Sequence, residues 1–395
     1  MLEIQTPAPG YKAVCPRCGL KLVEGYEGVT EAVAYHVTAL MLFVVANAFP
    51  FITYEMEGRS HNTHLINGIF EFFNQGFWNI GILVALVTFV FPLFKIAGTL
   101  YVLYPLRYGR HFPYARKVFA WIETLHPWSM VEVFSIGIIV AYVKLIDYAT
   151  VELHTALYAF GALIVVLVAG DAAINRREVW NALGPSQGSQ GDGDKVLVCH
   201  ICDFVLTDAA EEPVPHCPRC ESHMHHRKPN GLARCAALSL AAALFYIPAN
   251  IYPVMTVIWF GRGFPDTIIS GVLSLIKQGL WPLAVIIFFA SILIPILKIL
   301  VLAFLMLSVK LRSSWKPRLR TQMFRLTEAI GRWSMIDVFM VGILIALVRL
   351  GNLASVEAGA GVASFAAVVV LTMFAAHAFD PRLIWDRMEK QPHDP

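Results

Sequence analysis

Charged residues are scarce in this chain of 395 residues. Asp, Glu, Lys and Arg make up 15% of it, whereas 57% of the residues are hydrophobic. An average soluble domain contains about 25% charged residues, so this composition excludes a chain that is water-soluble throughout. The formal net charge is only +3. The basic residues gather at the ends of apolar stretches, which argues against a nucleic-acid partner.

Signatures of common enzymes are also lacking. The sequence contains no P-loop, no dinucleotide-binding fingerprint and no HExxH motif. We therefore expect no enzymatic activity, and ATP-driven transport would require a separate subunit. The first 32 residues lack an apolar core preceded by positive charge. We therefore expect no cleavable signal peptide and a first membrane helix that itself directs insertion.

Long apolar stretches, in contrast, are abundant. Eight of them are long enough to cross a bilayer, which takes about 20 residues of helix. They run roughly over residues 33–53, 78–104, 128–146, 154–172, 234–255, 280–309, 333–350 and 358–379. The sequence therefore predicts an all-α polytopic membrane protein.

Motifs of the first half recur in the second half at a nearly constant offset of 203 to 205 residues. The matching pairs are Ala46–Pro50 with Ala249–Pro253, Gln75–Trp78 with Gln278–Trp281, Pro92–Lys95 with Pro295–Lys298, and Trp128–Phe134 with Trp333–Phe339. Shared hydrophobicity alone would not keep the offset constant. The pattern predicts two tandem repeats of four transmembrane helices, a common arrangement in membrane transport folds.

The repeats divide the chain into six predicted segments. Residues 181–198 are rich in Gly, Ser and Asp, which is typical of a flexible, solvated linker. We expect a partial zinc ribbon at 1–32, the first repeat at 33–180, the linker at 181–198, a zinc ribbon at 199–230, the second repeat at 231–380 and a cytoplasmic tail at 381–395.

The distribution of Lys and Arg predicts the orientation in the membrane. Basic residues concentrate in the loop between the second and third apolar stretches of each half, and the third-to-fourth loops have almost none. We therefore expect both termini, the linker and the basic loops to be cytoplasmic. The external connections at 54–77 and 256–279 each contain a short apolar piece. Each piece is either a helix lying on the outer face or a loop packed on the bundle.

Two CxxC motifs form the sharpest chemical signal in the chain. Cys199 and Cys202 are followed, after fourteen residues, by Cys217 and Cys220. Four thiolates at this spacing converge on one Zn²⁺, and a reducing cytoplasm keeps them from forming disulfides. We predict one closed, structural zinc site. The rival interpretation is a pair of redox motifs, but no thioredoxin-like βαβ pattern surrounds them.

The first half has only one such motif, Cys15 and Cys18. Two thiolates do not make a stable structural zinc site. Three explanations are open: this copy of the ribbon has degenerated, the true start of the protein lies upstream, or a ligand from outside the segment completes the site. The sequence does not choose among the three.

Polar residues at membrane depth form a second candidate site. A charge inside an apolar helix costs about 2.5–3.5 kcal/mol on insertion scales, so each one calls for a reason. The second half offers Lys298, Ser334 and Asp337 as a transport cluster. The first half offers the corresponding residues, which are Lys95, Ser129 and Glu132. The alternative is an ion pair in each half that only locks two helices together.

These features resemble those of the paraquat-inducible protein A family. The resemblance rests on repeated four-helix units, the CxxC motifs and the ANxxP, PxxK and WSMxDVF signatures, and it covers nearly the whole chain. Phe379–Asp386 resembles the C-terminal motif of the family. The chain departs from the family at the amino-terminal cysteines and at Ile174–Arg177, where the first repeat lacks the Phe-Asp-Pro-Arg sequence.

The resemblance implies an inner-membrane protein of Gram-negative bacteria with a helical membrane domain and a cytoplasmic zinc-ribbon module. It also implies an MCE-domain partner that forms a periplasm-spanning tunnel, and a function in passing membrane phospholipids between the inner membrane and that tunnel. Two alternatives remain at this point. One is a non-transporting scaffold or assembly factor for the MCE partner, and the other is a redox- or metal-responsive membrane sensor.

Overall fold

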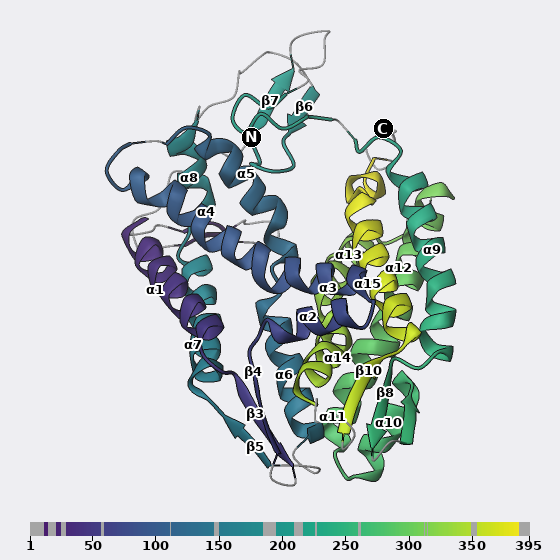
Figure 1. Cartoon of the computed structure of the whole chain (residues 1–395). Coiled ribbons are helices and arrows are strands. Elements are labelled where there is room, and N and C mark those ends of the chain that lie inside the picture. Colours follow the sequence, from purple (N-terminus) through teal and green to yellow (C-terminus); the bar gives the residue numbers. More distant parts are fainter. Residues whose placement is uncertain are drawn as a thin grey trace. The chain divides into compact units, whose positions relative to one another are not determined.

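The structure is a computed structural model of the chain (Figure 1). It describes residues 12–14, 21–24, 29–56, 59–110, 112–145, 150–184, 195–208, 216–225, 227–259, 262–311, 313, 315–348 and 354–386. Cys15, Cys18, most of the predicted linker (185–194) and the tail beyond residue 386 lie outside these residues. The described residues are mostly helical.

Eight helices in this part of the chain are long and apolar enough to span a membrane, as predicted. They are Val29–Ala48, Trp78–Leu106, Ala115–Val143, Thr155–Ala172, Gly231–Ile251, Trp281–Lys310, Pro317–Ala346 and Ala360–Ala378. The third helix of each half begins thirteen to sixteen residues before the predicted apolar stretch. These first turns are amphipathic and carry charges, so a search for uninterrupted apolar residues does not find them.

The membrane helices follow one order in both halves, and one short helix comes after the last of them in each half. The first half contains α1 (Val29–Ala48), α3 (Trp78–Ala85), η1 (Leu86–Val90), α4 (Phe91–Leu106), α5 (Ala115–Leu125), η2 (His126–Trp128), α6 (Val131–Leu145), α7 (Thr155–Ala172) and α8 (Arg176–Leu183). The second half contains α9 (Gly231–Ile251), α11 (Trp281–Phe288), η3 (Phe289–Leu293), α12 (Ile294–Lys310), α13 (Pro317–Gly331), η4 (Arg332–Met335), α14 (Ile336–Leu347), α15 (Ala360–Ala378) and η5 (Pro381–Ile384).

A π-helical turn interrupts the second membrane helix of each half. The turns are η1 and η3, and each ends just before a proline, Pro92 or Pro295. Proline has no N–H to donate, and its ring clashes with the carbonyl four residues earlier. Widening the preceding turn relieves this conflict without ending the helix.

The loops between the helices contain antiparallel strands, which the all-α prediction missed. One sheet has the order β4-β3-β5, and a second has the order β10-β8-β9. The strands are β3 (Ile52–Met56), β4 (Arg59–Thr63), β5 (Thr150–Leu153), β8 (Met255–Trp259), β9 (Arg262–Asp266) and β10 (Ala354–Ala358), and two further pairs are β1 (Lys12–Val14) with β2 (Lys21–Glu24) and β6 (Lys195–Val198) with β7 (Val205–Asp208). β3 pairs with β5 about 100 residues later, and such distant pairing leaves no local sequence pattern.

The two short apolar pieces in the external connections are helical. They form α2 (Asn67–Asn74) and α10 (Ile268–Lys277). Ile69 and Phe72 of α2 are buried. Phe72 lies against Gly342 of α14, where an added Cβ would come within 2.8 Å of the Phe72 ring.

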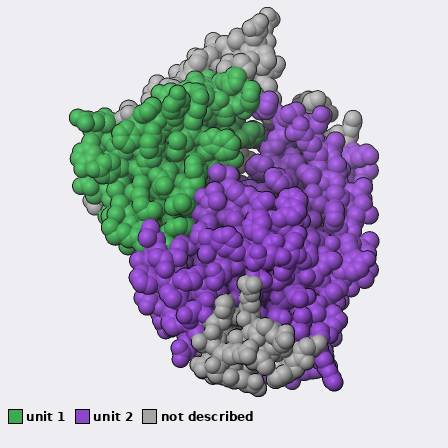
Figure 2. Space-filling view, viewed as in Figure 1, with its two compact units in different colours: residues 1–43, 93–124, 162–224 green, residues 44–92, 125–161, 225–395 purple. Residues whose placement is uncertain are grey.

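Two compact units make up the chain (Figure 2). Unit 1 comprises Met1–Phe43, Leu93–Thr124 and Ala162–Met224, and unit 2 comprises Val44–Pro92, Leu125–Gly161 and His225–Pro395. The core of unit 1 includes Phe119 and Trp180, whose ring centroids are 4.9 Å apart. In unit 2, Phe134 of α6 and Phe339 of α14 meet edge to face with ring centroids 5.4 Å apart.

The C-terminal Phe-Asp-Pro-Arg segment closes one end of the second-half bundle. The carboxylate of Asp380 accepts hydrogen bonds from the backbone N–H of Arg382 (3.0 Å) and of Lys228 (3.4 Å). Phe379 is buried beside Phe324. Trp385 Nε1 donates to Thr321 Oγ1 of α13 (3.0 Å). This motif therefore has a packing role in the structure.

Candidate functional site

Four buried cysteines, Cys199, Cys202, Cys217 and Cys220, converge in unit 1. All four Sγ atoms lie within 4.8 Å of one another. The closest pairs are Cys199 with Cys220 at 3.5 Å and Cys202 with Cys217 at 3.6 Å. A tetrahedral zinc with Zn–S bonds of about 2.3 Å requires S···S separations of about 3.8 Å. The donor set and its spacing therefore fit a tetrahedral metal ion.

The same backbone turn presents the two cysteines of each CxxC motif. The residue after the second cysteine, Asp203 or Glu221, has a left-handed backbone, with φ of 53° and 61° respectively. Each turn is closed by a backbone hydrogen bond from the first cysteine of the motif. Cys199 N donates to Phe204 O (2.9 Å), and Cys217 N donates to Ser222 O (2.8 Å). The strands β6 and β7 flank the first turn.

Electrostatics also favour a cation at this point. The pKa of Cys199 lies well below its ordinary value because Cys202, and then Cys217 and Cys220, donate hydrogen bonds to its sulfur. The pKa of Cys202 is raised, chiefly because it is the donor to Cys199. Ser222 Oγ lies 2.9 Å from Cys220 Sγ and 3.3 Å from Cys199 Sγ. Protons and a dication compete for the same sulfur lone pairs, so a bound dication would let all four thiols ionise.

The cysteine cluster belongs to the same core as helices of the first half. Arg219, between Cys217 and Cys220, is buried, and its Nη2 donates to Asn181 Oδ1 of α8 (2.8 Å). Its guanidinium also lies over the Phe204 ring, 4.8 Å from the centroid. Lys117 and Glu221 form an exposed ion pair at 3.1 Å, which contributes little in water. The buried arginine is therefore the main polar link between the cluster and α8.

In the second half, two of the three predicted polar residues come together. Lys298 is buried in α12, and its Nζ donates to Thr372 Oγ1 of α15 (3.0 Å). Nζ also lies against Gly331, where an added Cβ would come within 2.9 Å. Ser334 Oγ donates to the carbonyl of the same glycine (2.8 Å). Asp337 is in α14, and its side chain lies outside the described part of the structure.

In the first half, Lys95 has an acidic partner that the sequence analysis did not select. Its Nζ lies 2.5 Å from Asp171 Oδ2, with the two side chains 9% and 25% exposed. Asp171 is in the last turn of α7. Ser129 is buried before α6, and Glu132 is half-buried in its first turn. Both of these belong to unit 2, whereas Lys95 belongs to unit 1.

Neither Thr372 nor Asp171 carried a signal that sequence reasoning could use. Thr372 is one hydroxyl in an apolar helix, and Asp171 lies close to the end of another. Only the approach of the neighbouring helix identifies each as a lysine partner.

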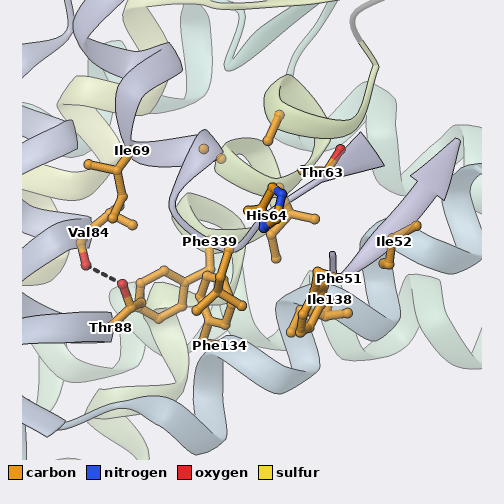
Figure 3. A pocket seen from close by; sticks show the side chains of 15 residues that line it. Phe51, Ile52, Thr63, His64, Ile69, Val84, Thr88, Phe134, Ile138 and Phe339 are labelled. Atoms are coloured by element: carbon orange, nitrogen blue, oxygen red, sulfur yellow. Dashed lines mark hydrogen bonds between the residues drawn. The ribbon is translucent and has the colours of Figure 1, made fainter. Parts of the chain in front are cut away.

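Unit 2 contains a small pocket with a mostly apolar lining (Figure 3). Its walls come from β3, β4, α2, α3, η1, α6 and α14: Phe51, Ile52, Thr63, His64, Leu65, Gly68, Ile69, Val84, Thr88, Phe134, Ile138, Phe339, Gly342, Ile343 and Ala346. Ile69, Val84 and Thr88 lie on one side, and Phe51 and Ile138 on the other. Sequence reasoning missed this pocket because its wall is assembled from seven separate elements.

Two hydroxyl groups and the imidazole of His64 interrupt this mostly apolar wall. Thr88 Oγ1 donates to the Val84 carbonyl (2.7 Å), so it presents little polarity to the pocket (Figure 3). Thr63 is 5% exposed, and its Oγ1 has no hydrogen-bond partner within the described ranges. The pocket thus presents mostly apolar side chains and one hydroxyl that is available to an oxygen or a donor.

Comparison with known proteins gives one family and several relatives. The Paraquat-inducible protein A family model matches residues 29–184 and again 232–389. The chain is 32% identical over 398 residues to the intermembrane transport protein PqiA of Escherichia coli strain K12, covering 98% of this chain and 93% of that protein. It is 30% identical over 378 residues to the lipophilic envelope-spanning tunnel protein A of the same strain, covering 95% and 87%.

A more distant relative is a probable intermembrane transport protein of Haemophilus influenzae. It is 26% identical over 389 residues, covering 96% of this chain and 92% of that protein. No solved structure matches the chain.

Proposed function

The chain belongs to the paraquat-inducible protein A family, and from this membership and the apolar pocket we propose that it is the inner-membrane subunit of an MCE-type intermembrane lipid transport system. It passes phospholipids between the inner membrane and a periplasm-spanning MCE-domain partner. Relatives named for intermembrane transport match it over nearly their full length. The observation that carries the proposal is the pocket in unit 2 with its mostly apolar lining.

The same proposal includes a duplicated membrane domain with both termini in the cytoplasm. The family model matches each half once. The π-helical turn, the three-stranded sheet and the short helix recur in the same order in each half. With basic loops on the cytoplasmic side, the sheets and the pocket face the periplasm. The pocket then lies where a lipid would be handed to a periplasmic partner.

One zinc ion bound by Cys199, Cys202, Cys217 and Cys220 completes the proposal. It would act structurally, because four protein ligands leave no open position for chemistry. Support comes from the burial of the four cysteines and from the spacing of their Sγ atoms. Cys15 and Cys18 lie outside the described residues, and no second metal is proposed.

The apolar lining of the pocket suits transient contact with an acyl chain. In water, burying each CH₂ group gains about 0.8 kcal/mol. A lipid that enters from the bilayer gains little of this, because its tail leaves surroundings that are already apolar. Entry and release therefore have similar free energies. A transporter needs that balance, whereas a permanent lipid anchor does not.

Photocrosslinking tests the lipid site directly. The full chain is placed in vesicles that contain a phospholipid with a photoreactive group on its acyl chain, and crosslinked peptides are identified by mass spectrometry. Val84→Phe fills the pocket from α3 and should reduce crosslinks to α6 and α14. Ile82→Phe is the matched control, because Ile82 lies on the same helix and is 43% exposed. The opposite result would be crosslinks that are spread over the exposed helix faces and that Val84→Phe does not change. A non-transporting scaffold would then be the better interpretation of the protein.

A further inference from the structure

His36 is a buried histidine that the transport proposal does not use. It lies in α1 and is 1% exposed. Its Nδ1 is 2.8 Å from the carbonyl of Ala32. A carbonyl only accepts hydrogen bonds, so Nδ1 carries the ring proton and Nε2 presents a bare lone pair. Nε2 is buried and has no hydrogen-bond partner among the residues that the structure describes. Leaving a buried polar group without a partner is unfavourable.

The ring of His36 sits beside the ion pair of Lys95 and Asp171. Gly170 of α7 touches it so closely that an added Cβ would lie 2.9 Å from His36 Cε1. The next residue is Asp171, which holds the Lys95 ammonium at 2.5 Å. Asp171 from α7 and Lys95 from α4 are the charged groups that act on the ring. Three titratable groups from three helices therefore meet in unit 1.

Asp171 occupies an unfavourable position for a carboxylate. It is in the last turn of α7, where the helix carbonyls already concentrate negative potential. Lys95 offsets this cost, yet an apolar residue at either position would avoid it. With a side chain 25% exposed, Asp171 is the member of the group most open to its surroundings.

From these contacts we propose that His36, Lys95 and Asp171 form a proton-binding site. A hydronium ion gives one proton to the Nε2 lone pair and leaves as water. The ring becomes an imidazolium with an N–H on both nitrogens. The new Nε2–H requires an acceptor, and it competes with Lys95 for the Asp171 carboxylate. Loss of the proton restores the observed Lys95–Asp171 contact. The site binds a proton whether or not the chain moves lipid, so the proposal goes beyond the proposed function.

The second half shows that the buried lysine does not require these partners. At the offsets of the repeat, Ser239 replaces His36 and Ala376 replaces Asp171, while Lys298 replaces Lys95. Lys298 is buried all the same and donates to Thr372. Holding a lysine between helices therefore does not explain His36 and Asp171. Their shared feature is that both change charge on binding a proton.

Nitrogen NMR of the full chain with ¹⁵N-labelled histidine tests the site. The chain has 13 histidines, so His36→Gln, or His36→Asn if the first does not fold, identifies the resonance. We expect its Nε2 to be unprotonated at high pH and to become protonated as the pH falls. Asp171→Asn removes a negative charge and should weaken proton binding about tenfold, which lowers the midpoint by about one pH unit. Lys95→Met removes a positive charge and should raise the midpoint by a similar amount.

Lys298→Met is the matched control, since it removes the corresponding lysine of the other half and should leave the His36 midpoint where it is. If neither His36 variant folds, the resonance that moves in opposite directions in Asp171→Asn and Lys95→Met serves as the assignment. The proposal is overturned if Nε2 keeps one protonation state throughout the pH range in which the protein stays folded. A midpoint that neither substitution moves would overturn it as well. Neither readout depends on lipid, so a failed lipid assay does not bear on it.

Discussion

Replacing Cys202 with Ser should remove the metal and loosen helices that lie far from it in sequence. The four cysteines share one core with Phe119 of α5 and Trp180 of α8. Arg219, inside the second CxxC motif, donates to Asn181 of α8. Loss of the metal should therefore be felt in α5 (Ala115–Leu125) and α8 (Arg176–Leu183) as well as in residues 195–224.

The magnitude follows from two free energies. Structural zinc contributes about 10–16 kcal/mol in small zinc modules at neutral pH. A whole domain is typically stable by only about 5–15 kcal/mol. A site that loses one of its four thiolates should therefore fail to hold residues 195–208 and 216–224 in their fold. Exposure of their buried side chains should lower protein abundance, whereas no chemical step is lost.

Metal analysis and hydrogen exchange measure the two parts of this prediction. The wild type should carry one zinc per chain, and Cys202→Ser none. In the variant, the amides of α5 and α8 should exchange faster, and those of α9 to α15 should change little. Cys235→Ser is the matched control: Cys235 is also buried, but it packs against α12, α13 and α15 in another core. Unchanged exchange in α5 and α8 of a metal-free variant would refute the shared core as a mechanical link. A zinc-free wild type would refute the site itself.

Other substitutions test the polar cluster and the topology. Asp337→Asn should insert at normal abundance but fail to support a lipid-dependent envelope function, and full activity in complementation would remove Asp337 from the mechanism. Lys298→Met should behave similarly, and the double variant should be no worse than either single one if the two residues act as a unit. For topology, Asn62→Cys in β4 should react with a membrane-impermeant thiol reagent added to the periplasm, whereas Ser189→Cys should react only after the membrane is opened. Labelling of Ser189→Cys from the periplasm would show that the orientation in the membrane is the opposite of the predicted one.

Much of the fold was predictable because apolar length is a local property. Eight membrane-spanning helices follow from runs of about 20 apolar residues, and all eight occur in the described chain. The strands did not follow, since β3 meets β5, and β8 meets β10, through backbone bonds between distant segments. The first turns of the third helices were missed for a different reason. Their amphipathic composition hides them from a search for uninterrupted apolar residues.

The candidate sites divide in the same way. The four cysteines lie in two short motifs, so their spacing alone indicated a candidate metal site. His36, Asp171 and Thr372 each look ordinary in sequence, as single polar residues in apolar helices. Their roles depend on which helix face approaches which, and a single sequence does not contain that information. The pocket is hidden for the same reason, because its lining residues extend from Phe51 to Ala346.

The π-helical turns connect these observations. Each turn precedes a proline, and each proline is followed three residues later by a buried lysine, Lys95 or Lys298. An extra residue in a turn rotates everything after it by about 100° relative to an uninterrupted α-helix. Without η1 and η3, the two lysines would point to other faces of their helices, away from Asp171 and Thr372. A widened turn and a buried charge are both unfavourable in isolation. Their joint presence at the same place in both halves is explained if the turn serves to aim the lysine into the bundle.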